Sequence, residues 1–106
     1  MKLLNSAEVT AIEYRISDKT FVCSFAHDPY QADIAISYKP TDYLLEYMEF
    51  ETWIKSIQET EMLIEDLCRV VFDKVYSVLG DIQFCVEIDA RSTVHAPVCV
   101  ILKNEV

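Results

Sequence analysis

Cys23 is the residue whose type and position are best suited to chemistry in this chain. It ends a short apolar stretch and is followed by a loop that contains His27 and Asp28 ahead of Pro29. A thiol attacks electrophilic carbon when a neighbouring group takes its proton, and loops held on a rigid scaffold often carry such groups. We therefore take Cys23 as the candidate nucleophile and His27 as the local group that could activate it.

Each of these residues also has a plain structural interpretation. A free cysteine is most often a small, half-buried hydrophobe, an aspartate before proline is typical of a turn, and Tyr30 is suited to packing. The four cysteines show no C-x-x-C spacing, and with the two histidines they give no ligand spacing typical of a metal site. Without a recognisable secretory signal, they are expected to be reduced thiols in the cytoplasm.

Hydrophobic periodicity predicts the elements that position this loop. Strands are expected at residues 8–16, 32–38, 82–91 and 94–103, with a turn at 17–19 and a short extended stretch at 20–23, and helices are expected at 42–57 and 61–79. Thr41 or Asp42 is the expected N-terminal cap of the first helix, and Gly80, the only glycine, the C-terminal cap of the second. Glu65 and Arg69 are spaced for a pair on the flank of the second helix, and His95 falls in the last predicted strand.

This order predicts an α+β fold, ββααββ, in one domain spanning residues 1–106. A four-stranded antiparallel sheet would carry both helices on one face. Such a sheet has two free edges, which natural proteins tend to cover or pair. Hydrophobic residues make up 52% of the chain, including six Tyr and five Phe. We therefore expect several sheets to join edge to edge into an oligomeric barrel.

The charge of the chain limits its partners. The formal net charge is −9, and the nine basic residues form no run. Binding to nucleic acid without sequence preference is driven by Lys and Arg on phosphates, so it is disfavoured, as is an anionic membrane surface. No apolar run is long enough for a transmembrane helix, and the N-terminal apolar stretch is too short for a signal peptide.

The ββααββ order and the Cys23 loop resemble those of the tunnelling-fold proteins, and among them the 7-cyano-7-deazaguanine nitrile reductases. The signature of that family is roughly Cys-Pro-x-Thr-Gly-Gln-Pro-Asp-Phe, followed by a strand ending in Tyr-x-Pro. Here Cys23 falls on the catalytic cysteine, Pro29 on the second proline, and residues 34–40, IAISYKP, on the strand and corner. The family's Phe-His-Glu-Asp stretch falls on residues 63–66, which places Glu65 on the glutamate that binds the purine-like ring.

The departures from the family pattern are specific. The proton-donating aspartate falls on Tyr30, although Asp28 is close enough to replace it if the loop is shifted, and the histidine falls on Ile64. The lysines that bind the phosphates of NADPH are missing, and residues 46–51, EYMEFE, stand in their place. Acidic side chains repel a dinucleotide phosphate. The resemblance therefore implies no redox cofactor.

The archaeosine-forming amidinotransferases resemble this chain more closely in length and lack the NADPH stretch. The resemblance implies attack of Cys23 on the nitrile, with Asp28 as catalytic partner and Glu65, His27 and Tyr30 at the ligand. The substrate would be a purine-like base, either free or carried on tRNA. The net charge of −9 makes tRNA the less favourable partner. The alternative is a non-catalytic tunnelling-fold module that binds a purine-like ring or serves in assembly.

Overall fold

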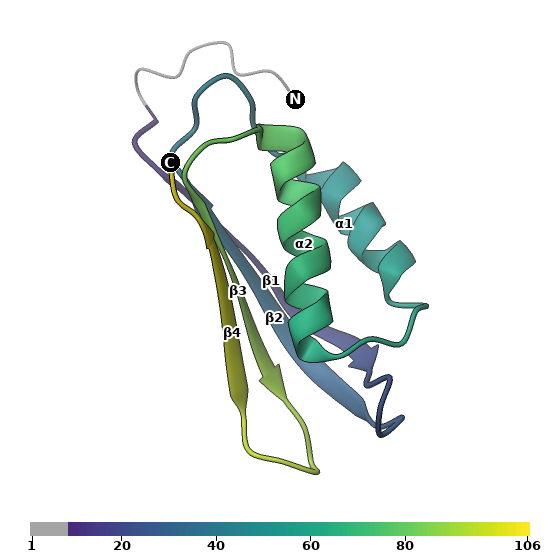
Figure 1. Cartoon of the computed structure of the whole chain (residues 1–106). Coiled ribbons are helices and arrows are strands. Elements are labelled where there is room, and N and C mark those ends of the chain that lie inside the picture. The colour runs from purple at the N-terminus through teal and green to yellow at the C-terminus, as the bar shows by residue number, and fades with distance from the viewer. Residues whose placement is uncertain (1–8) are drawn as a thin grey trace.

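The computed structural model describes residues 9–106 and confirms the predicted α+β fold with its ββααββ order (Figure 1). All strand pairs are antiparallel, in the order β1-β2-β3-β4, and the sheet is open. The elements are β1 (Ile12–Val22), β2 (Pro29–Tyr38), α1 (Tyr47–Ile57), α2 (Ile64–Leu79), β3 (Phe84–Arg91) and β4 (Val98–Asn104). Both helices lie on one face of the sheet, as predicted.

The first strand continues to Val22, so its predicted end at Ile16 and the predicted turn at residues 17–19 were wrong. The partners of Ile16 and Lys19 on β2 are only two positions apart, so β1 contains one extra residue there. Asp18 takes a positive φ of 56° at this β-bulge. The bulge shifts the alternation by one residue, and Ile16 and Phe21 therefore both face the core. The predicted start at residue 8 lies outside the described residues.

The core lies between the sheet and the helices and follows the predicted alternation. Every second residue of β2 and β3 is buried, which is the pattern of a sheet covered on one face. Within residues 9–106 no polar or charged side chain belongs to the buried set. The buried residues of the two central strands are Tyr30, Ala32, Ile34, Ile36, Tyr38, Phe84, Val86, Ile88 and Ala90.

Both helices begin later than predicted. The N-cap of α1 is Glu46, whose carboxylate accepts the N–H of Glu49 at 2.6 Å, so Thr41 and Asp42 do not cap it. The second helix starts only after Leu63, which is extended and gives no side-chain cap. Its end agrees with the prediction, because Gly80 is the C-cap and takes a φ of 79°.

The two helices cover different strands. Tyr14 on β1 donates to the Glu51 carboxylate of α1 at 2.8 Å, and its ring lies 4.6 Å from that of Tyr47. Helix α2 packs on β3 and β4 instead. In the part of the chain from residue 9 onward, no element covers the opposite face of the sheet.

None of the described helices is long and apolar enough to cross a membrane.

Candidate functional site

Three connecting segments meet at one end of the sheet. Val22 and Pro29 pair at the ends of β1 and β2, so the β1–β2 loop lies there. Gln31 pairs with Arg91, which places the β3–β4 connection at the same end. The α1–α2 connection joins them, because the N–H of Met62 donates to the carbonyl oxygen of Val22 at 2.9 Å. Figure 1 shows the start of α2 at this end of the sheet.

A cavity of about 380 Å³ opens among these segments. Its size is within the range of small-molecule sites, and most of its lining is apolar. The lining residues are Cys23, Tyr30, Leu63, Ile64, Glu65, His95, Ala96 and Val98. The structure therefore brings together Cys23, Tyr30 and Glu65, three of the five residues singled out in the sequence.

Backbone hydrogen bonds fix the position of Cys23 within its loop. Its N–H donates to the carbonyl oxygen of Asp28, and its own carbonyl oxygen accepts the N–H of His27, both at 2.9 Å. His27 takes a positive φ of 61°, which a tight loop of this kind requires. The thiol is half-buried and packs against the edge of the core.

The two loop residues next to Cys23 are not among the cavity-lining residues. The His27 Nδ1 lies 2.7 Å from a Glu61 carboxylate oxygen, in an exposed pair. Asp28 is half-buried, and its carbonyl oxygen accepts the N–H of Cys23. The predicted roles of His27 as a ligand contact and Asp28 as a catalytic partner gain no geometric support from the cavity lining.

Tyr30 forms a fixed wall of the cavity. Its side chain is buried, and its O–H donates to the Met62 carbonyl oxygen at 3.0 Å. Burial raises the pKa of Tyr30 well above its ordinary value, and the nearby Cys23, Asp66 and Glu65 add to the rise. The phenol therefore stays protonated at neutral pH and cannot supply a base there.

Glu65 is in the first turn of α2 and lines the cavity from the helix side. Its predicted partner, Arg69, instead lies 3.8 Å from the carboxylate of Asp73, one turn further on. The guanidinium of Arg69 also lies over the ring of Phe72, 5.3 Å from its centre. Glu65 is thus placed at the cavity, while Arg69 pairs in the opposite direction along the helix.

His95 is the titratable residue of the cavity lining that the sequence did not single out. It was assigned to a strand, but β4 begins only at Val98, and His95 lies in the connection that follows Arg91. Pro97 was the available signal, because proline is poorly tolerated inside a strand. Its position just before β4 leaves His95 free to lie over the cavity that contains Cys23.

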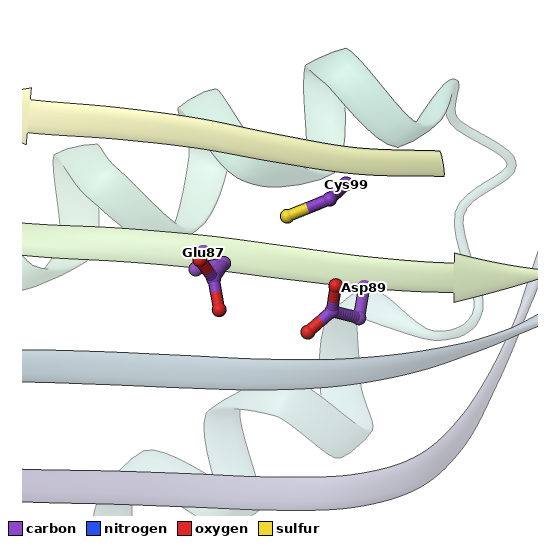
Figure 2. A group of neighbouring side chains, drawn as sticks. All are labelled: Glu87, Asp89 and Cys99. Carbon is purple, nitrogen blue, oxygen red and sulfur yellow. The ribbon is translucent and has the colours of Figure 1, made fainter. Parts of the chain in front are cut away.

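A second group of side chains lies on the uncovered face of the sheet. Figure 2 shows Glu87 and Asp89 on β3 beside Cys99 on β4. Their ligand atoms all lie within 4.8 Å of one another, and in the part of the chain described this is the one such group that could hold a metal ion. Sequence spacing did not reveal it, because Cys99 reaches the acids only through its cross-strand pairing with Asp89.

Comparisons with known proteins do not assign the chain to a family. No protein-family model matches it, and no curated protein matches it in sequence.

Proposed function

We propose that this chain is a cysteine-dependent enzyme of 7-deazaguanine metabolism that acts on the nitrile of 7-cyano-7-deazaguanine. The observation that carries the proposal is that one cavity is lined by both Cys23 and Glu65. The resemblance independently assigns Cys23 to nucleophilic attack and Glu65 to ring binding. They belong to segments far apart in the chain, so their presence in one cavity is not a consequence of their spacing.

The cavity supplies what an aromatic heterocycle needs. Leu63, Ile64 and Val98 give apolar walls against which a flat ring can pack. The Glu65 carboxylate accepts hydrogen bonds from the N–H groups at the edge of a guanine-like ring, and such charge-assisted bonds are strong. This leaves the nitrile at the opposite side of the ring for Cys23.

The reaction proceeds by covalent catalysis. A bond forms between the Cys23 sulfur and the nitrile carbon, the nitrile nitrogen takes a proton, and a thioimide results. Ammonia or a simple amine then adds to the thioimide carbon. The carbon–sulfur bond breaks, the sulfur takes a proton, and an amidine is released. No atom is oxidised or reduced, so the sequence of steps needs no redox cofactor.

The surface around the start of α1 favours amination over NADPH-dependent reduction. A groove of about 640 Å³ lies between the helices. Glu46 and Glu49 line it, and Lys74 is its one basic residue. Two carboxylates beside a single ammonium make this groove a poor site for the phosphates of a dinucleotide.

The same proposal includes a homo-oligomer. The free edges of β1 and β4 join to those of neighbouring copies and close a barrel, which removes the edges. The substrate is the free base or a tRNA-borne base, and the charge of −9 favours the free base.

A non-catalytic ring-binding module is the second candidate. Tyr30 and Ile64 occupy the positions of the family's aspartate and histidine. Ile64 has no titratable group, and the Tyr30 phenol stays protonated at neutral pH with its O–H donated to Met62. This substitution favours a protein that retains the cavity for binding or assembly and has lost the reaction.

Intact mass spectrometry separates the two candidates. The wild-type chain, Cys23→Ala and the matched control Cys99→Ala are incubated with 7-cyano-7-deazaguanine without cofactor. We expect an adduct equal to the whole ligand, because a thiol adds across a nitrile without losing atoms. The adduct should be absent in Cys23→Ala and present in Cys99→Ala.

Two other results would count against the enzyme. Saturable binding without an adduct would favour the binding module. The absence of both binding and adduct would rule out both functions and leave only the fold.

A further inference from the structure

We propose that His95 is the proton-transfer residue of the Cys23 cavity; this inference rests on the function proposed above. His95 lines the cavity together with Cys23, Tyr30 and Glu65, and these four are its titratable lining residues. It reaches the cavity from the β3–β4 connection. This connection is far from the Cys23 loop in the sequence, but both lie at the same end of the sheet.

The hydrogen bond of the His95 ring fixes its tautomer. The Nδ1 atom lies 2.7 Å from the carbonyl oxygen of Ala96. A carbonyl oxygen only accepts, so Nδ1 carries the hydrogen and donates it. In the neutral imidazole, Nε2 is then the unprotonated nitrogen. This arrangement orients the ring and leaves one nitrogen able to accept a proton.

The other titratable groups around the cavity are less suited to this role. The Tyr30 O–H is already donated to Met62 and stays protonated at neutral pH. Glu65 is engaged with the ring of the substrate in the proposed function. Asp66 is near Tyr30 but does not line the cavity.

The other histidine does not compete either. The Nδ1 atom of His27 lies 2.7 Å from the Glu61 carboxylate, and His27 does not line the cavity. His95 therefore replaces the histidine that the family carries at the position of Ile64, and it does so from a different segment of the chain.

His95 takes up one proton and returns it in each of the two steps of the reaction. In the first, Nε2 of His95 takes the proton of the Cys23 thiol as the sulfur–carbon bond forms. The imidazolium then gives that proton to the nitrile nitrogen, which leaves a neutral thioimide and a neutral ring. In the second, Nε2 takes a proton from the attacking amine and returns it to the sulfur as the carbon–sulfur bond breaks.

The test follows the rate of adduct formation with 7-cyano-7-deazaguanine by intact mass, from pH 5 to pH 9. The variants are His95→Gln and His95→Asn, with Thr93→Ala, an exposed residue of the same β3–β4 connection, as the matched control. A general acid–base group contributes about 10²- to 10⁴-fold, so we expect the His95 variants to be slower by at least about 10²-fold. Their pH profile should differ from that of the wild type, and Thr93→Ala should resemble the wild type.

A second measurement makes the test independent of the nitrile substrate. Alkylation of Cys23 by iodoacetamide is followed over the same pH range by peptide mass spectrometry, and the circular dichroism spectrum confirms that each variant is folded. We expect both His95 variants to change the rate and its pH profile. Wild-type rates and profiles in both variants would overturn the role of His95.

The two proposals fail in distinguishable ways. If the wild type forms no adduct, the nitrile function fails, and the alkylation profiles alone decide whether His95 serves Cys23. If the wild type forms the adduct and the His95 variants form it equally fast, the nitrile function stands and the inference about His95 is wrong.

Discussion

Cys99 shows how a neighbouring pair of carboxylates changes the chemistry of an exposed thiol. Partial desolvation against β3, a hydrogen bond to Asp89 and the charges of Asp89 and Glu87 raise the pKa of Cys99 to about 11, from an ordinary value of 9.0. The thiolate is the form that reacts with alkylating agents. Cys99 should therefore be accessible and yet slow to react.

We predict that iodoacetamide labels Cys99 about 100-fold more slowly at pH 8 than it labels an unhindered cysteine peptide. Each unit of raised pKa lowers the thiolate fraction about tenfold when the pH is below both values. Asp89→Asn should restore part of this rate, because it removes one of the negative charges. Peptide mass spectrometry after timed labelling measures both rates.

The matched control for this prediction is Asp73→Asn, which removes an exposed carboxylate from α2. It should leave the labelling of Cys99 unchanged. Labelling of wild-type Cys99 as fast as the free peptide would show that the carboxylates do not hold the proton on its sulfur.

At the scale of single residues, the sequence predicted part of the candidate site. Cys23 and Glu65 could be chosen because the order and spacing of the chain resemble those of a known family, and the two residues line one cavity. His95 could not be chosen, because the alternation of residues 94–103 is typical of a strand. Pro97 is the signal against a strand there, since proline is poorly tolerated inside one. The group around Cys99 was also missed, because cross-strand neighbours depend on register, which composition does not reveal.

At the scale of elements, the β-bulge of β1 depends on a cluster of charges. The Asp33 carboxylate accepts the N–H of Asp18 at 2.9 Å, and Arg91 lies 3.2 Å from its second oxygen. Arg91 also contacts Asp18 at 2.7 Å. The hydrogen bond from Asp18 and the interaction with Arg91 lower the pKa of Asp33 below its ordinary 3.8.

We predict that Asp33→Asn destabilises the fold by about 1 kcal/mol at pH 7, a modest value because its partner Arg91 is exposed to solvent. A carboxylate with a lowered pKa in the folded state contributes stability above the unfolded value of 3.8. That contribution is lost as the pH falls through the folded value. The difference between wild type and Asp33→Asn should therefore shrink below pH 3.8.

Urea denaturation at neutral and acidic pH measures this difference, with the exposed Asp42→Asn as the control. A difference that is the same at both pH values would mean that the ionised form of Asp33 has no special role at the bulge.

The end of α2 depends on backbone freedom. Gly80 has φ 79° and ψ −165°, a region used almost only by glycine. A methyl group at this position would meet no atom within 4 Å, so any penalty comes from the backbone and not from a clash. We predict that Gly80→Ala lowers the free energy of unfolding by about 1–2 kcal/mol.

Urea denaturation gives this value, and Ser77→Ala, one turn earlier on α2, is the matched control. A loss below about 0.5 kcal/mol in Gly80→Ala would show that the chain relaxes to another ending of the helix.

The elements themselves were largely predictable, and their boundaries were not. The alternation of apolar and polar residues predicted β2 and β3, because each strand has one fully buried face. The start of α1 was misplaced because a glutamate caps it, and glutamate is not among the preferred capping residues. The bulge in β1 was taken for a turn because Ser17, Asp18 and Lys19 suit either structure.

At the scale of the whole molecule, the sheet leaves two features that a partner would cover. The edges of β1 and β4 are unpaired within residues 9–106, and the face opposite the helices carries no element. Ile101 lies on that face in edge strand β4 and is 50% exposed. An apolar side chain at an open edge is a typical site of strand-to-strand association.

We predict that Ile101→Lys dissociates the proposed barrel, because a charged lysine on an edge strand opposes pairing with a strand of a neighbouring copy. Met48→Lys is the matched control: Met48 is 79% exposed and belongs to helix α1, not to an edge strand. Light scattering coupled to size-exclusion chromatography should give a multiple of the chain mass for wild type and Met48→Lys. It should give a smaller species for Ile101→Lys. A wild-type mass equal to one chain at all concentrations would contradict the barrel, and the Cys23 cavity would then have to act within a single copy.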